Sequence, residues 1–156
     1  MSWVILTAAA LVVGTTTTAS AETLSGPARV IDGDTIELAG ERIRLHGIDA
    51  PEGRQYCTAE GTEYPCGDMA AAHLVNLTLG KHIECNGQER DRYKRPIAVC
   101  YADGVDLNGA LVRAGWAVAY RRCSSDYVDE EDEARSNRVG MWPGTFDMPW
   151  EWRRKK

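Results

Sequence analysis

Apolar and polar residues alternate along several short runs of the chain, and this period of two predicts half-buried β-strands. In the run 42–46, Ile43 and Leu45 share one face, and the basic residues between them share the other. Asp32-Gly33 is a tight-turn dipeptide, and residues 39–41 form a second turn signal. The runs that predict strands are residues 28–31, 35–38, 42–46, 82–85 and 97–101.

Apolar residues at helical spacing predict a helix over residues 68–79, and turn, cap and stop signals predict two more after the strands. Gly80, Gly115 and Gly140 follow the three predicted helices and are expected to end them. Ser125 or Asp126 is expected to cap the third segment. The predicted helices cover residues 68–79, 106–114 and about 126–138. The remaining long segments are expected to be loops at 49–66 and 86–95 and irregular chain at 141–152.

Five short strands interrupted by helices predict an α+β, mainly β, fold. The natural candidate is a five-stranded β-barrel of the oligonucleotide-binding (OB) type with about three helices. The 156 residues suit one domain of the commonest size, and no internal repeat or linker is visible. Residues 22–156 are therefore expected to form a single domain.

The first 21 residues have most features of a cleaved signal peptide. A short apolar run, Trp3–Val13, is followed by threonines, and Ala19-Ser20-Ala21 fits a small-residue cleavage site. The start of the segment lacks the usual Lys or Arg. A membrane anchor is the alternative, but the apolar run is too short for a bilayer of about 30 Å. We therefore expect an exported protein, periplasmic or secreted, that keeps no membrane segment after cleavage.

The formal net charge of −5 limits the kinds of partner that the chain can bind. It argues against a protein that coats nucleic acid through its overall charge, because such domains usually have a pI above ~9. A local basic cleft on an acidic body is still compatible with it. Acids gather in residues 126–133, and bases gather in residues 42–54, 90–95, 121–122 and in a tail at 153–156.

The chain has five cysteines, which in an exported protein are expected to form disulfides. Cys57 and Cys66 bracket a polar loop, which favours a local bridge. Cys85 and Cys100 lie in two strand-like runs, which suits a bridge across strands. Cys123 would then be unpaired. A zinc site is the alternative, but no CxxC or paired Cys/His spacing supports it.

Three acids and an arginine lie close together in the sequence: Asp34, Arg44, Asp49 and Glu52. Hard cations take oxygen ligands, phosphate pairs with guanidinium, and a water that attacks phosphorus needs a base. Asp34, Asp49 and the Ala50 carbonyl would give an oxygen-only site suited to weakly held Ca²⁺. Each residue also has an ordinary explanation: a hairpin turn for Asp34, an exposed strand face for Arg44 and a solvated loop for Asp49.

RDRYKR at residues 90–95 is a basic loop that carries one aromatic side chain. Arg95 precedes Pro96, where a strand begins, and the strand could aim its side chain. Tyr93 and Tyr120 could stack on bases or serve as amphipathic cover of the surface. Taken alone, the loop is better explained as a solvated run of charge that needs no function.

Taken together and in order, these segments resemble the thermonuclease, or staphylococcal-nuclease-like, family. The motifs run from about Arg29 to Trp142 and are IDGDTIEL, RLHGIDAPE, DRYKR, YADG, LNGALVRAGWAVAY and GMWPG. Each motif is unspecific alone, but their conjunction is highly specific. The resemblance implies an OB-type barrel with helices and a Ca²⁺-dependent phosphodiesterase site.

By motif position, the resemblance assigns metal and water chemistry to four residues. Asp34 and Asp49 match the metal carboxylates, and Ala50 stands where a backbone carbonyl ligand is expected. Glu52 matches the residue that activates or positions the attacking water. Alanine at position 50 should be harmless, because the backbone supplies the ligand.

The resemblance also assigns the substrate contacts. Arg44 and Arg95 match the arginines that bind the scissile phosphate. Tyr93 and Tyr120 match tyrosines that contact nucleotides, and Arg92, in the same basic loop as Tyr93, is expected to bind substrate with them.

The chain departs from the family pattern at three places. Lys94 stands where the basic loop more usually has glycine, so a positive φ there would strain Lys94 and could shift Arg95. Arg122 replaces a second aromatic expected after Tyr120, which would weaken stacking. The loop with Cys57 and Cys66 is also unusual, although it is plausible in exported relatives.

The function implied is an endo/exonuclease that hydrolyses DNA and RNA with low sequence selectivity and leaves 3′-phosphates. We expect a monomer without a stable protein partner and with the acidic helix 126–138 facing away from the substrate. Two alternatives stay open. One is a secreted OB-fold module that binds nucleic acid without cutting it, and the other is a disulfide-linked structural domain.

Overall fold

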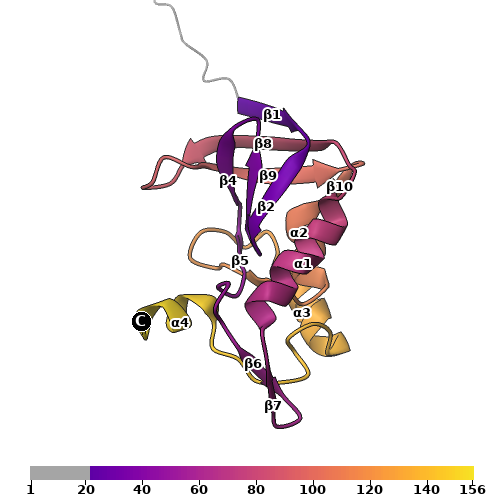
Figure 1. The fold of residues 1–156 in the computed structure, drawn as a ribbon, viewed down its shortest axis with the longest axis vertical. Helices are drawn as coiled ribbons and strands as arrows, with labels where there is room; N and C mark the ends of the chain where they lie inside the picture. Colours follow the sequence, from indigo (N-terminus) through magenta and orange to yellow (C-terminus); the bar gives the residue numbers. More distant parts are fainter. Residues whose placement is uncertain (1–21) are drawn as a thin grey trace, which may run out of the picture.

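The structure is a computed structural model that describes residues 22–156, so the predicted signal peptide lies outside the described residues. A curled sheet forms one half of the molecule, and the helices pack beside and below it (Figure 1). The α+β, mainly β, fold expected from the sequence is confirmed, and all five predicted strands are present. Within the described residues, no helix combines the length and hydrophobicity needed to cross a membrane.

The main sheet has the strand order β1-β8-β9-β4-β3-β2, and β10 pairs with β9. Its neighbours are antiparallel except β4 and β9, which run parallel. These strands are β1 (Glu22–Gly26), β2 (Ala28–Asp32), β3 (Thr35–Leu38), β4 (Glu41–Leu45), β8 (Ile83–Arg90), β9 (Pro96–Ala102) and β10 (Val105–Asp106). Two small sheets pair β5 (Ile48–Asp49) with β11 (Val118–Ala119) and β6 (Cys57–Ala59) with β7 (Thr62–Tyr64).

The alternation in β3 and β4 places their apolar side chains on one face, where they enter the core. Ile36 and Ile43 face each other in the register and are fully buried. Helix α1 (Cys66–Thr78) covers this core with Ala70 and Leu74. A Cβ at Gly33 would lie 2.7 Å from the Cβ of Ala50 and 3.0 Å from that of Ala70. Glycine in the β2–β3 turn therefore lets α1 and the chain after β5 approach closely.

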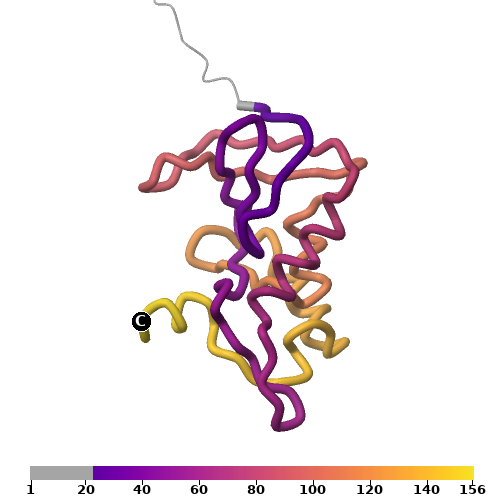
Figure 2. Tube along the Cα trace, viewed as in Figure 1, coloured from indigo at the N-terminus to yellow at the C-terminus, as the bar shows by residue number. Residues whose placement is uncertain are grey.

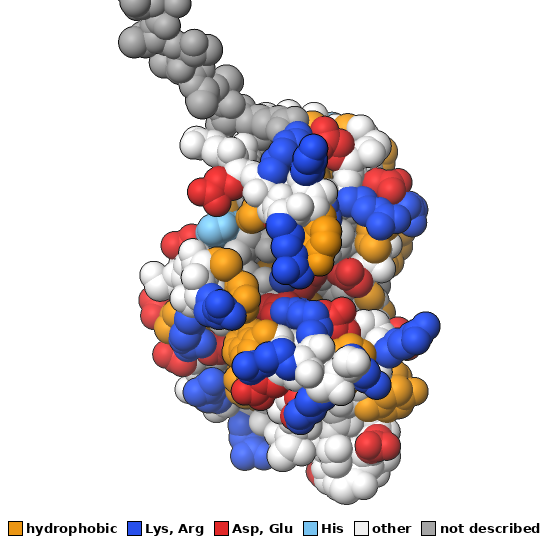
Figure 3. Space-filling view, turned by 90° about the vertical axis from the view of Figure 1, so that its left-hand side faces the viewer, with side chains coloured by type: hydrophobic (Ala, Val, Ile, Leu, Met, Phe, Trp, Pro, Cys, Tyr) orange, Lys and Arg blue, Asp and Glu red, His pale blue; other side chains and the backbone are white. Residues whose placement is uncertain are grey.

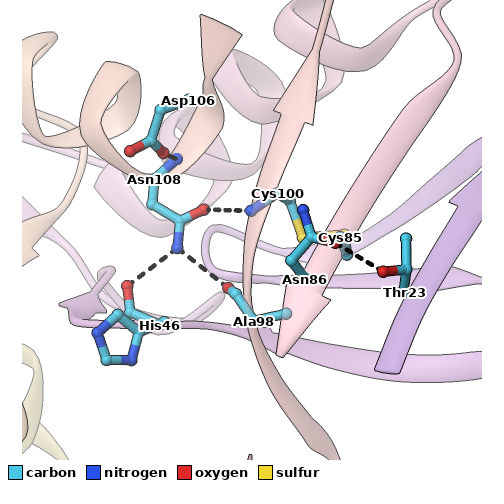
Figure 4. Close-up of a disulfide and its surroundings, with 8 residues drawn as sticks. All are labelled: Thr23, His46, Cys85, Asn86, Ala98, Cys100, Asp106 and Asn108. Carbon is cyan, nitrogen blue, oxygen red and sulfur yellow. Dashed lines mark hydrogen bonds between the residues drawn. A yellow bond between two sulfur atoms is a disulfide. The ribbon is translucent and has the colours of Figure 1, made fainter. Parts of the chain in front are cut away.

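Helix α2 (Leu107–Arg113) is tied to the sheet by one buried amide (Figure 4). The Asn108 side chain accepts a hydrogen bond from the Cys100 N–H and donates to the carbonyls of His46 and Ala98. The Asp106 carboxylate caps the helix by accepting from the N–H groups of Asn108 and Gly109. These bonds satisfy a fully buried polar side chain and hold the chain after β4 in place.

Both disulfides expected from the spacing are present. Cys85 and Cys100 face each other in the β8–β9 register and are bonded (Figure 4). Cys57 and Cys66 link β6 to the first residue of α1. Cys123 is exposed and carries no disulfide partner within the described residues.

Two of the predicted loops contain strands. β8 continues to Arg90 although residues 86–90 are polar, because its backbone pairs with β9 as far as Pro96. The loop predicted at 86–95 is therefore shorter. The β6–β7 hairpin lies inside the loop predicted at 49–66, and it is too short and too exposed to show an alternating pattern.

The C-terminal part also differs from the prediction. Helix α3 (Val128–Asn137) begins after Tyr127 without a side-chain cap, so the caps predicted at Ser125 or Asp126 are wrong. It ends at Arg138, which adopts a left-handed conformation with φ 51°. A further helix, α4 (Pro149–Arg154), forms where irregular chain was expected. Figure 2 traces this yellow segment past the β6–β7 hairpin, where Thr58 and Thr145 pair, and on to α4.

Candidate active site

A cavity of about 640 Å³ gathers most of the predicted site residues at one place. Acidic side chains lie at the bottom of a hollow on this face, and Lys and Arg side chains surround it (Figure 3). Asp49 is fully buried and reaches the cavity through contacts with two arginines. The predicted residues that line the cavity are Asp34, Arg44, Ala50, Glu52, Arg92, Tyr93, Arg95 and Tyr120.

The β2–β3 turn positions Asp34. The Asp32 carboxylate accepts a hydrogen bond from the Asp34 N–H at 3.1 Å, as expected of an acid that serves its own turn. The Asp34 carboxylate accepts from the Ala50 N–H at 2.8 Å and from the Thr35 hydroxyl at 3.2 Å. Asp34 therefore joins the turn to the chain that leaves β5.

Arg44 lies on β4 and connects the two aspartates predicted to bind metal. Its guanidinium pairs with the Asp34 carboxylate, and its Nη2 donates to Asp49 Oδ1 at 3.0 Å and to the Ile48 carbonyl at 3.2 Å. Burial by itself would lower the pKa of Arg44, but the charges of Asp34 and Asp49 outweigh it and raise that pKa. Arg44 is thus a permanently charged bridge in the floor of the cavity.

The acids of this floor lack sufficient compensating charge. Burial first, and then the nearby charge of Asp34, raise the pKa of Asp32 to about 6. Burial also raises the pKa of Asp49, although hydrogen bonds from Arg153 oppose the shift. The floor holds more carboxylates than guanidinium groups, so the ionised cluster has excess negative charge. Its carboxylates are those of Asp32, Asp34, Asp49 and Glu52, and its guanidinium groups are those of Arg44 and Arg153. Such a cluster favours an additional cation.

The second guanidinium belongs to Arg153 on α4, a residue predicted to be part of a basic tail. Its two terminal nitrogens donate to both Asp49 oxygens, at 3.0 and 2.7 Å, and Nη1 also donates to Glu52 Oε1 at 2.6 Å. These two carboxylates outweigh its desolvation and raise the pKa of Arg153. A helix signal was available: Pro149 occupies the first helical position before Trp-Glu-Trp-Arg-Arg. Nothing in the sequence places that helix beside the acids.

The loop between β8 and β9 is organised by Asp91. Its Oδ1 accepts from the N–H groups of Tyr93 and Arg95, and its Oδ2 accepts from Arg95 Nε at 2.7 Å. Burial alone would raise the pKa of Asp91, but the bonds from Arg95 and Tyr93 outweigh it and hold the pKa below its usual value. Arg95 therefore lines the cavity from a prearranged position.

Lys94 has φ 65°, so this position does require the conformation that glycine adopts easily. A left-handed residue costs a non-glycine side chain about 1–2 kcal/mol. The loop holds it with two hydrogen bonds, one from the Lys94 N–H to the Asp91 carbonyl and one from Arg90 to the Lys94 carbonyl. The expected strain is thus present, and the hydrogen bonds of Asp91 still hold Arg95.

Aromatic side chains border the cavity on two sides. Tyr93 is 66% exposed, and the Arg92 guanidinium lies 4.8 Å from its ring centre. Tyr120 contacts Trp150 of α4, with 5.5 Å between the ring centres. No residue of α3 is among those that line the cavity, so the acidic helix does not face it. The cavity thus combines a basic and aromatic border with an acidic floor.

The oxygen ligands near Arg44 suit a hard divalent cation, although they are few. Asp34 and Asp49 offer carboxylate oxygens and both contact Arg44. In the described part of the chain, no group of three or more His, Cys, Asp or Glu side chains is arranged to hold a metal. A cation here would take two carboxylates and complete its shell with backbone carbonyl and water.

Comparison with known proteins adds independent information. A family model described as staphylococcal nuclease homologue matches residues 42–144. The succinoglycan biosynthesis protein ExoI of Rhizobium meliloti (strain 1021) is 42% identical over 127 residues, which cover 79% of this chain and 66% of that protein. An uncharacterized endonuclease of Escherichia coli O157:H7 is 38% identical over 82% of this chain and 83% of its own. The micrococcal nuclease of Shigella flexneri is 33% identical over a region that covers 81% of this chain and 78% of that protein.

Proposed function

Because this chain belongs to the staphylococcal nuclease homologue family and is a nuclease-type hydrolase, we propose that it is a Ca²⁺-dependent nuclease of DNA and RNA. It cuts internally and from ends, has low sequence selectivity and leaves 3′-phosphates. The observation that carries the proposal is the joining of Asp34 and Asp49 through Arg44 in the floor of one cavity.

Asp34, Asp49 and the carbonyl of Ala50 are the proposed Ca²⁺ ligands. The bound cation would neutralise a phosphate oxygen. So few protein ligands predict weak binding, with a Kd of about 10⁻⁴–10⁻³ M. The excess of carboxylates over guanidinium groups supports this assignment.

Glu52 is the proposed base. Its half-buried carboxylate lines the cavity and takes a proton from the attacking water. The water oxygen then bonds to phosphorus while the bond from phosphorus to the 5′-oxygen breaks. The leaving oxygen takes its proton from water, because arginine has too high a pKa to donate one. Arg44 and Arg95 hold the charge that grows on the other phosphate oxygens.

Arg92, Tyr93 and Tyr120 are the proposed substrate contacts. The exposed ring of Tyr93 is available for stacking on a base, and the arginines beside it suit the phosphate backbone. Stacking tolerates any base, and residues 22–156 present no helix or ribbon that would read base edges, which supports low selectivity. DNA and RNA are both proposed substrates for this reason.

We also propose that residues 1–21 are removed on export and that residues 22–156 act as a single monomeric domain in the periplasm or outside the cell. The two disulfides support an oxidising compartment.

Plasmid cleavage with and without a chelator tests the proposed function. We expect degradation with Ca²⁺, none after chelation, and products whose 5′ ends accept phosphate from a kinase without prior dephosphorylation. Glu52→Gln should remove cleavage while plasmid binding remains. Binding by the parent protein without any cleavage would contradict the proposal and favour the non-catalytic OB-fold module.

A further inference from the structure

Arg153 places a positive charge where the proposed cation would bind. Its guanidinium forms a two-pronged pair with Asp49 and extends to Glu52, with separations of 2.6–3.0 Å. α4 lies beyond the residues that match the family model, which end at 144. Arg153 is therefore a feature of this chain that the family match does not cover.

The arginines occupy the oxygens that a cation would need. Asp49 is fully buried, and its carboxylate contacts the guanidinium groups of Arg44 and Arg153. Oδ1 accepts from both Arg44 and Arg153, and Oδ2 accepts from Arg153 at 2.7 Å. These contacts fill three of the about four lone-pair positions of the carboxylate, so a cation that coordinates Asp49 lies against the Arg153 guanidinium and competes with it.

The side chain of Arg153 can move while its helix stays in place. Pro149 is buried, Trp150 packs on Tyr120, and Gln55 donates to the Asp147 carbonyl at 2.7 Å, so the start of α4 is anchored. The Arg153 side chain is 40% exposed, compared with 18% for Arg44. A long and partly exposed side chain can swing into solvent without unpacking the helix.

We propose that Arg153 is an internal counter-ion that competes with the divalent cation for Asp49. In the cation-free protein it neutralises Asp49 and engages Glu52, and it releases both carboxylates when the cation binds. The identity of the cation as Ca²⁺ rests on the proposed function. Arg153 thus lowers the affinity of the site for the cation. It also keeps Glu52 engaged until the cation is bound.

Calorimetric titration of the purified protein with Ca²⁺ alone tests this competition. Arg153→Gln should tighten Ca²⁺ binding at least tenfold. Arg154→Gln is the matched control, because it makes the same charge change on the same helix, and it should alter the affinity less than twofold. Equal effects of the two variants, or no tightening in Arg153→Gln, would overturn the proposal.

A second measurement follows the Arg153 side chain of the unmodified protein, and the variant serves only to assign its resonance. The Nε–H resonance of Arg153, assigned by its loss in Arg153→Gln, should move toward the position of a free arginine as Ca²⁺ is added. The Arg44 resonance should stay protected from exchange. An Arg153 resonance that stays fixed at saturating Ca²⁺ would overturn the proposal. Both readouts are independent of cleavage, so failure of the proposed nuclease activity is recognised separately in the plasmid assay.

Discussion

Arg44 and Arg153 bind the same carboxylate, that of Asp49, from two very different parts of the fold. Arg44 lies in the middle of the sheet and also bonds the Ile48 carbonyl, whereas Arg153 lies on a six-residue helix next to the C-terminus. The first is nearly buried and the second is partly exposed. A buried arginine between two acids is part of the framework, whereas an exposed one on the same acid can be exchanged for another cation.

The largest expected effect is the loss of Arg44. Arg44→Ala leaves the carboxylates of Asp34 and Asp49 buried without the guanidinium between them. The free energy of unfolding should therefore fall by about 3–5 kcal/mol. Cleavage should fall by at least about 10²–10³-fold, because a preorganised phosphate contact is lost. Urea unfolding followed by Trp fluorescence and plasmid cleavage measure the two effects. A variant as stable as the parent would show that Arg44 does not belong to the framework.

Glu52→Gln separates chemistry from framework. The amide keeps the shape of the side chain but cannot take a proton, so cleavage should fall about 10²–10⁴-fold. The stability change should stay within about 0.5 kcal/mol, since the side chain is partly exposed. Initial rates of plasmid cleavage and urea unfolding test both statements. Unchanged cleavage would remove Glu52 from the proposed mechanism.

Arg153→Gln should affect stability much less than Arg44→Ala. Partly exposed ion pairs contribute about 1 kcal/mol or less, and Asp49 still has Arg44 as a partner. Urea unfolding in the absence of divalent cations measures the difference. A loss as large as that of Arg44→Ala would erase the distinction between framework and exchangeable arginine.

The smallest expected effect concerns the loop that holds Arg95. The pKa of Asp91 is lowered, so its bonds to Arg95 and Tyr93 stabilise the loop above the unfolded pKa of about 3.9 and are lost as the pH falls through the lower, folded value. An NMR titration of Asp91 should show a midpoint below about 3.9. Asp91→Asn should raise KM for plasmid a few-fold at pH 7. A midpoint at or above the unfolded value would mean that the loop is not held by Asp91.

The sequence predicted those parts of the fold that repeat a local pattern. The alternation of Ile43 and Leu45 predicted β4, and the spacing of Cys85 and Cys100 matched a bond across two strands. It failed where pairing depends on the backbone alone, as in the polar end of β8. The sequence also failed to predict α4, a short helix that is stabilised by a distant contact between Trp150 and Tyr120.

By itself, the sequence determined five of the strands, the disulfide spacing and the candidate residues from Asp34 to Tyr120, because each depends on neighbours in the chain or on a run of motifs in order. Only the tertiary structure brought Arg153 to Asp49, across 104 positions of the chain. Periodicity describes which side of an element is buried, but it carries no information about which distant charge will lie against it. The packing of α4 determines this contact, because it brings the Arg153 guanidinium against the carboxylates of Asp49 and Glu52.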